Sequence, residues 1–167
     1  MKIEKLQSLS DDISDELLSV WEKSVRSSHH FLKEEDIEYF KPLVRNQYFP
    51  AVELFVARNE NGRIAAFMGL SDDMLEMLFV LPEEQGRGYG KAFVEYAVSK
   101  CNIHKVDVNE DNEQAYKFYL HMGYKVVGRD ELDSSGKPFP ILHLQQPQQK
   151  GYAPGNRTVA KSPPAAS

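Results

Sequence analysis

The apolar residues of this chain change between helical and strand-like spacing several times before residue 144, and this alternation limits the folds open to it. Helical spacing covers 13–25 and 37–44, strand-like runs cover 52–58, 63–70 and 74–80, and short segments of both kinds alternate from 90 to 144. Such a chain can bury its apolar residues as an α/β (α+β) domain, in which helices flank a mixed, mostly antiparallel central sheet. The strand–helix–strand step around residues 90–101 requires at least one parallel crossover.

Turn and cap residues mark the boundaries of these segments. Ser10 precedes the first helical segment as a candidate N-cap, and we expect Pro42 to interrupt the second. Asn61-Gly62, between two strand-like runs, is typical of a tight hairpin, and Gly123 is expected to end the last helix. The predicted order is two helices, a hairpin, a strand, a helix, a strand, a helix and a second hairpin.

Composition divides the chain at residue 144. A chain of 167 residues with 41% hydrophobic residues can bury the core of one globular domain. The segment 145–167 is rich in proline, glutamine and small residues, so it cannot bury enough apolar surface to offset the entropy cost of ordering. We therefore expect a single domain over 1–144 and a disordered tail over 145–167.

Charge and cysteine content argue against several classes of function. The net charge of −5 disfavours a general nucleic-acid-binding protein, which needs a basic surface for phosphate contacts. Cys101 is the single cysteine, so the sequence offers neither an internal disulfide nor a cysteine-based metal site. We find no window with the length and apolarity of a signal peptide or a membrane-spanning helix. These features predict a cytoplasmic protein without metal, membrane or nucleic-acid partners.

The segment LPEEQGRGYGKA at 81–92 places Gly86, Gly88 and Gly90 at alternate positions after a predicted strand. The spacing does not match a Walker loop, because only three residues separate Gly86 from the Gly90-Lys91 pair. It does not match a dinucleotide-binding fingerprint either, because Lys91 holds the position that needs the third glycine. Neither of these nucleotide-binding layouts therefore explains the glycines.

Two interpretations of the glycine-rich segment stay open on its own residues. Backbone amides at the start of the following helix, with the cations Arg87 and Lys91, would bind an anion such as a pyrophosphate. A tight strand-to-helix turn that needs glycine for steric reasons explains the segment equally well.

Two motifs in the chain resemble the GNAT superfamily of N-acetyltransferases. The stretch QGRGYG at 85–90 matches the Q/R-x-x-G-x-G/A pyrophosphate loop of that family position for position. The stretch NEDNEQAYKFYLHMGY at 109–124 is similar to its later segment N-x-x-A-x-x-F-Y-x-x-x-G-F, with Tyr124 in place of the usual Phe. The motifs stand in the family's order, and the resemblance covers residues 1–144.

The resemblance implies a GNAT-type fold with acetyl-CoA as cosubstrate and a primary amine as acceptor. That amine would belong to a small molecule, a protein lysine or a protein N-terminus, and both a monomer and a homodimer stay open. The backbone of 77–80 would pair with the pantetheine arm, leaving an amide to stabilise the oxyanion, and the amides of 86–90 would hold the pyrophosphate. The implied cofactor-binding residues are Leu78, Phe79, Val80, Gln85, Gly86, Arg87, Gly88, Tyr89, Gly90, Lys91 and Asn112, the last on the opposite side of the arm.

The resemblance also implies catalytic roles. Tyr119 matches the family's motif tyrosine, whose phenol can protonate the departing CoA thiolate. The same helical spacing is typical of core packing, so a structural role for this ring is the alternative. Glu76 and Asp107 lie on predicted strands and are candidate general bases that could relay a proton through water. Carboxylates at such positions more often belong to a strand surface, and members of the family can also lack a dedicated base.

The acceptor side is less defined by the sequence. The stretch SSHHFL at 27–32, with His29 and Phe31 as candidate acceptor-binding residues, and GKPFPIL at 136–142 resemble a bacterial subgroup whose substrates are mostly undefined. The acidic residues near both candidate walls, which would favour a cationic amine, are Glu34, Glu35, Asp36, Asp72, Asp73 and Asp130.

Two functions of different classes follow. The first is an N-acetyltransferase that uses acetyl-CoA, and the second is a non-catalytic CoA-binding or regulatory module. The presence of Tyr119 favours the enzyme, because a module that only binds the cofactor has no need of a phenol at that position.

Overall fold

The computed structural model describes residues 1–147. Its elements in chain order are β1 (Ile3–Lys5), α1 (Asp11–Ser28), α2 (Glu34–Leu43), β2 (Glu53–Arg58), β3 (Ile64–Leu70), β4 (Met74–Val80), α3 (Tyr89–Cys101), β5 (Lys105–Asn109), α4 (Glu113–His121), β6 (Lys125–Asp130) and β7 (Ile141–Gln145).

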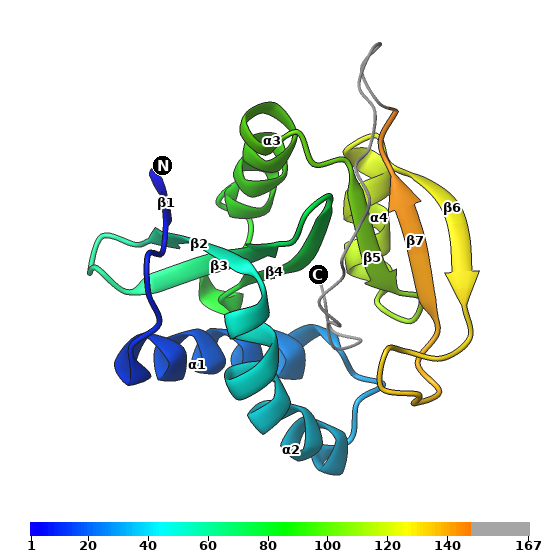
Figure 1. Ribbon diagram of the computed structural model, residues 1–167, viewed down its shortest axis with the longest axis horizontal. Coiled ribbons are helices and arrows are strands. Elements are labelled where there is room, and N and C mark those ends of the chain that lie inside the picture. The colour runs from blue at the N-terminus through cyan, green and yellow to red at the C-terminus, as the bar shows by residue number, and fades with distance from the viewer. Residues whose placement is uncertain (148–167) are drawn as a thin grey trace.

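The strands form one seven-stranded sheet in the order β1-β2-β3-β4-β5-β7-β6 (Figure 1). β4 and β5 are parallel, and the neighbouring pairs on either side of them are antiparallel. The predicted mixed, mostly antiparallel sheet with one parallel crossover is therefore confirmed. The crossover between β4 and β5 contains α3, because parallel neighbours need a long connection, which is usually a helix.

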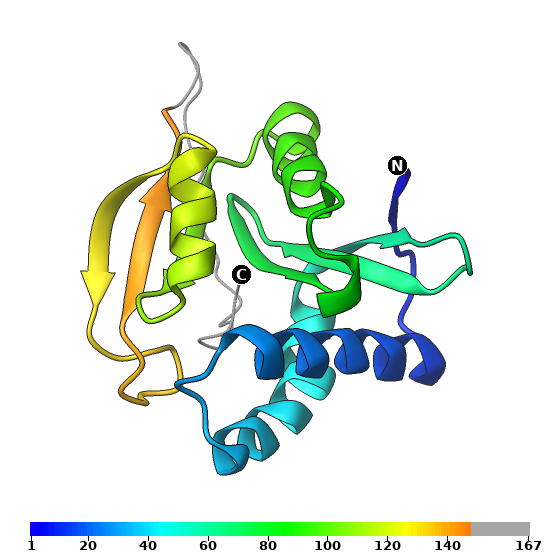
Figure 2. The same ribbon diagram turned by 180° about the vertical axis from the view of Figure 1, so that it is seen from behind.

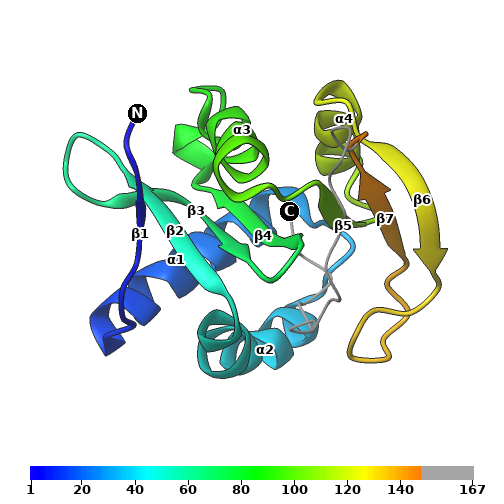
Figure 3. The same cartoon turned by 45° about the horizontal axis from the view of Figure 1, so that its top comes forward.

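Helices cover both faces of the sheet. Figure 3 shows α3 and α4 on one side of the strands and α1 and α2 on the other, and α4 lies over β5 and β7 in Figure 2. Each face of the sheet has its own core. Phe93 of α3 and Tyr119 of α4 belong to the core on one face, the α3 core, whereas Trp21 of α1 and Phe40 of α2 belong to the core on the other face, the α1 core. All four side chains are fully buried.

β4 separates from β5 after Leu75, its second residue. The two strands pair only at Met74 with Lys105 and at Leu75 with Val106. The register between β3 and β4 shifts at the same level, so that Glu76 is an extra residue on β4. A bulge bends a strand and increases its twist, which turns the remainder of β4 away from β5. Residues 77–80 then pair with β3 alone, and alternate amides and carbonyls point into the gap.

The N-terminal part departs from the prediction in two ways. β1 was not predicted, because a three-residue edge strand with one half-buried side chain has no readable alternation. Pro42 does not interrupt α2 but lies inside it. The chain continues as a π-helical turn over Val44–Tyr48 and a 3₁₀ turn over Phe49–Ala51. Burial of Val44 and Phe49 holds these turns against the sheet, which compensates for the hydrogen bond that proline cannot make.

The domain also extends beyond the predicted boundary at residue 144. Gln145 is the last residue of β7 and pairs with Lys105. The side chain of Gln146 donates a 2.7 Å hydrogen bond to the Met122 carbonyl. These two residues, predicted to belong to the tail, are therefore part of the fold. The remainder of the predicted tail, from residue 148 onward, lies outside the described residues.

Among residues 1–147, no helix combines the length and the apolar character that crossing a membrane requires.

Candidate active site

A cavity of about 310 Å³ lies where the C-terminal end of α1, the separated part of β4, the glycine-rich loop and α4 meet. Of the predicted cofactor residues, all except Arg87 line it: Leu78, Phe79, Val80, Gln85, Gly86, Gly88, Tyr89, Gly90, Lys91 and Asn112. His29 and Tyr119 line it as well. The fold thus brings His29 and Tyr119, which are far apart in the sequence, into one cavity wall.

The glycines of the loop have distinct structural reasons. Gly86 and Gly88 adopt φ values of +80° and +89°, which residues with a Cβ rarely adopt, and Gly88 is the N-cap of α3. A Cβ at either position would project into open space. A Cβ at Gly90 would instead lie 3.2 Å from the Phe118 ring, so this glycine allows α3 and α4 to approach each other. The loop therefore leaves bare backbone facing the cavity at the start of a helix.

The two predicted cations of the loop differ in position. Lys91 lines the cavity, and its side chain is largely exposed, 3.9 Å from Glu95. The Arg87 guanidinium instead pairs with the buried carboxylate of Glu84 at 2.9 Å. Glu84 lines the cavity, whereas Arg87 does not. The role of Arg87 as a cofactor-facing cation is thus not supported by its position.

Tyr119 is fully buried and still contributes to the cavity wall. Its ring makes edge-on contacts with Phe118 and Tyr124, with centroids 5.0 and 5.3 Å away. These contacts fix the plane of the ring. The ring therefore packs in the core, and the same residue borders the cavity, while its role as a general acid stays a prediction.

The two candidate bases are placed elsewhere. Within the described part of the chain, neither Glu76 nor Asp107 lines the cavity. Glu76 is the bulge residue of β4, and its carboxylate accepts a 2.8 Å hydrogen bond from Ser71. Asp107 lies 2.7 Å from Nδ1 of His143, whose Nε2 lies 2.9 Å from Asp130. Burial lowers the pKa of His143, but its contacts with these two carboxylates outweigh burial and raise it. The structure therefore does not bring the two carboxylates together with Tyr119.

His29 and Asn112 contact each other in the cavity wall. The exposed fraction is 3% for each residue, and Nε2 of His29 lies 3.2 Å from Nδ2 of Asn112. Asn112 is the N-cap of α4, and its Oδ1 accepts a hydrogen bond from the Ala115 amide. Burial, with a smaller contribution from the neighbouring His30, lowers the pKa of His29 to about 3. The imidazole is therefore neutral at physiological pH.

The remaining predicted acceptor residues lie outside the cavity wall. Phe31 packs between His29 and Phe139, at centroid distances of 5.3 and 5.8 Å. Several of the predicted acidic residues are engaged in ion pairs: Glu34 with Arg26, Asp36 with Lys137, Asp73 with Lys105, and Asp130 with His143. They do not form a free acidic wall.

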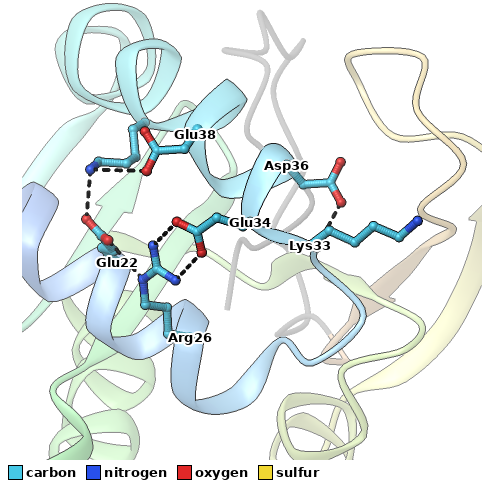
Figure 4. Close-up of polar contacts among 7 residues, drawn as sticks. Glu22, Arg26, Lys33, Glu34, Asp36 and Glu38 are labelled. Atoms are coloured by element: carbon cyan, nitrogen blue, oxygen red, sulfur yellow. Dashed lines mark hydrogen bonds and ion pairs between the residues drawn. The ribbon is translucent and has the colours of Figure 1, made fainter.

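An ion-pair network holds the segment that carries His29 (Figure 4). Arg26 of α1 makes hydrogen bonds of 2.6 and 2.8 Å to both oxygens of Glu34 on α2, and a third to Glu22. Lys41 of α2 forms an ion pair with the same Glu22 at 3.1 Å. Exposed pairs contribute little singly, but this network ties both ends of the connection between the helices.

The sequence-based prediction missed six residues of the cavity wall: Ser24, Ser28, Glu84, Gln114, Ala115 and Phe118. Ser24 and Ser28 stand four positions apart on α1, and a polar pair on the inner side of an amphipathic helix was an available signal. Among residues 1–147, no group of three or more histidine, cysteine or acidic side chains could hold a metal ion.

Comparison with known proteins identifies the family. Residues 50–126 match the model of the acetyltransferase (GNAT) domain. The peptidyl-lysine N-acetyltransferase YjaB of Escherichia coli K12 is 42% identical over 130 residues, which cover 78% of this chain and 88% of that protein. The chain belongs to the GNAT acetyltransferase family. It is accordingly an acetyltransferase, as the two motifs predicted.

Other GNAT proteins give the same result. YjaB of Salmonella typhimurium is 37% identical over 133 residues, covering 80% of this chain and 91% of that protein. The solution structure of apo YjaB from Escherichia coli superposes with a TM-score of 0.78 at 38% identity, covering 89% of this chain and all of that one. The PaiA N-acetyltransferase of Thermoplasma acidophilum, solved with coenzyme A, shares the GNAT fold at 19% identity and a TM-score of 0.63, over 87% of this chain and 99% of that one.

Proposed function

We propose that this GNAT protein transfers the acetyl group of acetyl-CoA to the side-chain amine of a protein lysine, by direct attack in a ternary complex. The observation that carries the proposal is that one cavity is bordered by the glycine-rich loop, the separated part of β4 and Tyr119. The similarity to YjaB, which is named a peptidyl-lysine N-acetyltransferase, supports lysine over a small-molecule amine.

The cavity fits the parts of the proposed cosubstrate. The amides of 86–90 at the N-terminus of α3 suit the phosphates, since the bare backbone at Gly86 and Gly88 allows close approach. The unpaired edge of β4 at 78–80 suits the amide-containing arm, which can add to it as a strand would. Acetyl-CoA supplies the activated acetyl thioester. An amide of the same edge is available to stabilise the oxyanion.

Tyr119 is the proposed general acid. Its phenol holds a proton that can pass to the sulfur when the carbon–sulfur bond breaks, so that the thiol rather than the thiolate leaves. The edge-on contacts with Phe118 and Tyr124 keep the ring in one orientation. Positioning of this kind lowers the barrier because the proton donor need not be recruited from solvent.

The proton lost by the attacking amine needs an acceptor. Glu76 and Asp107 stay the proposed bases, but neither lines the cavity among the described residues, so each would act through water. The pH dependence of turnover in the Glu76→Gln and Asp107→Asn variants tests this, because loss of the base removes the acidic limb of the profile. A profile unchanged in both variants would exclude both residues.

We propose that the enzyme is cytoplasmic. The single cysteine, Cys101, is half-buried, and burial raises the pKa of its thiol. A thiol of this kind suits a reducing compartment.

Release of CoA thiol from acetyl-CoA, measured with a panel of amines, tests the function. A lysine-containing peptide should be acetylated, and a peptide of the same sequence with its lysine already acetylated is the matched control. Acetylation of small amines alone would replace the proposed substrate class. Binding of acetyl-CoA without thiol release on the panel would support the non-catalytic module instead.

A further inference from the structure

A chain of hydrogen bonds runs along the cavity wall from α4 to α1, and its direction is fixed at both ends by the backbone. The Ala115 amide can only donate, so Oδ1 of Asn112 accepts it at 3.2 Å and Nδ2 faces Nε2 of His29 at 3.2 Å. Nε2 must then be the unprotonated nitrogen, and the ring hydrogen resides on Nδ1. Nδ1 lies 2.8 Å from Oγ of Ser28, which donates its own hydrogen to the Ser24 carbonyl at 2.9 Å.

Burial makes this arrangement specific. His29 and Asn112 are each 3% exposed, so water does not compete for their hydrogen bonds. Because burial holds the pKa of His29 near 3, the ring remains neutral and its Nε2 keeps a lone pair for Asn112. Both ring nitrogens are therefore used by the protein itself, which argues against the predicted direct role of His29 in acceptor binding.

The bond connects parts of the site that are distant in sequence. His29 ends α1, and Asn112 begins α4 83 positions later. Ser24 and Ser28 border the same cavity. Two turns beyond Asn112, α4 presents Tyr119 to it.

We propose that His29 is a positioning residue, which through Nε2 holds the Asn112 amide and the N-terminus of α4 in the orientation that binds acetyl-CoA. The proposal rests on the proposed function, because it assumes that Asn112 contacts the cosubstrate. It assigns to His29 a role through another residue rather than a contact with the acceptor.

A matched pair of variants tests the bond. In His29→Gln the amide oxygen reaches about as far as Nε2 and can accept from Asn112, whereas in His29→Asn the shorter side chain reaches only as far as Nδ1. We expect His29→Gln to bind acetyl-CoA with nearly wild-type Kd. His29→Asn should raise the Kd about tenfold, as loss of one buried hydrogen bond does. Equal Kd values for the two variants, whether retained or raised, would overturn the proposal.

A measurement on the wild-type protein is independent of any loss of folding. Nitrogen-15 NMR of the labelled histidine ring should show His29 as the neutral tautomer protonated at Nδ1 at pH 7. A ring protonated at Nε2, or at both nitrogens, would overturn the proposal. If wild-type protein does not bind acetyl-CoA, the proposed function fails, whereas the tautomer still tests the bond between His29 and Asn112.

Discussion

Two parts of the cavity wall, the backbone-built end at residues 86–90 and the side-chain-built end at His29, Asn112 and Tyr119, are built by different means. At the loop end, glycine φ angles and the start of α3 expose backbone amides, and the nearby Arg87 side chain turns away to Glu84. At the side-chain-built end, the side chains of His29, Asn112 and Tyr119 contribute to the wall, and tertiary packing brings His29 of α1 against the start of α4. A site made of backbone depends on a short stretch of sequence, whereas a site made of side chains depends on the whole fold.

Placing a charge on the backbone-built end should have the largest effect. Gly88→Asp introduces a carboxylate at an N-cap with φ of +89°, where the side chain would project into open space. We expect acetyl-CoA affinity to fall more than about a hundredfold, because a phosphate and a carboxylate would compete for the same amides. Isothermal titration measures it. Gly88→Asn, which has the same shape and also tolerates a positive φ, is the control. Equal affinity for the two variants would show that the glycines serve only the turn.

Removing one hydroxyl at the side-chain-built end should come next. Tyr119→Phe keeps the contacts with Phe118 and Tyr124 but lacks the transferable proton. We expect kcat to fall about a hundredfold, near the lower limit for loss of acid catalysis, because a thiolate is a tolerable leaving group. The KM for acetyl-CoA and the melting temperature should change little. Wild-type turnover in steady-state assays would exclude Tyr119 as the acid.

The pH dependence of stability distinguishes the side-chain end further. The pKa of His29 is 6.5 when exposed and about 3 in the fold, so below pH 6.5 the unfolded chain binds a proton that the folded chain does not. The contribution of the neutral His29 to the free energy of unfolding is therefore present above pH 6.5 and is lost as the pH drops toward 3. The free energy of unfolding should fall by about 2 kcal/mol between pH 7 and pH 5. Urea unfolding at each pH measures it. His29→Gln should remove this part of the dependence, and a parallel decline in both proteins would assign it to other groups.

The smallest effect should come from a side chain of the backbone-built end. The Arg87 side chain is 66% exposed and bound to Glu84, so Arg87→Gln should weaken acetyl-CoA binding by no more than about threefold. Lys91→Gln, which removes a cation that does border the cavity, should weaken it more. The reverse order in the same titration would mean that Arg87 leaves Glu84 when the cosubstrate binds.

The contrast explains what could be predicted from sequence. The hairpin at Gly62, the helix start at Gly88 and the position of Tyr119 follow from local patterns, because turn chemistry and helical spacing act over a few residues. The bond between His29 and Asn112 could not be predicted, because no local pattern specifies which side chains meet across 83 positions. Asp107 illustrates the same limit, since strand alternation does not predict that its carboxylate contacts the His143 ring.

The extra residue at Glu76 changes the parity of β4. Strict alternation would put Leu75, Met77 and Phe79 on one face, yet Leu75 packs with Leu78 in the α3 core, and Met77 and Phe79 pack in the α1 core. Deleting Glu76 would therefore remove the bulge and leave Met77 and every later residue of the strand on its present face, whereas replacing its side chain would leave the bulge in place. At this position the length of the chain carries more information than the identity of the residue.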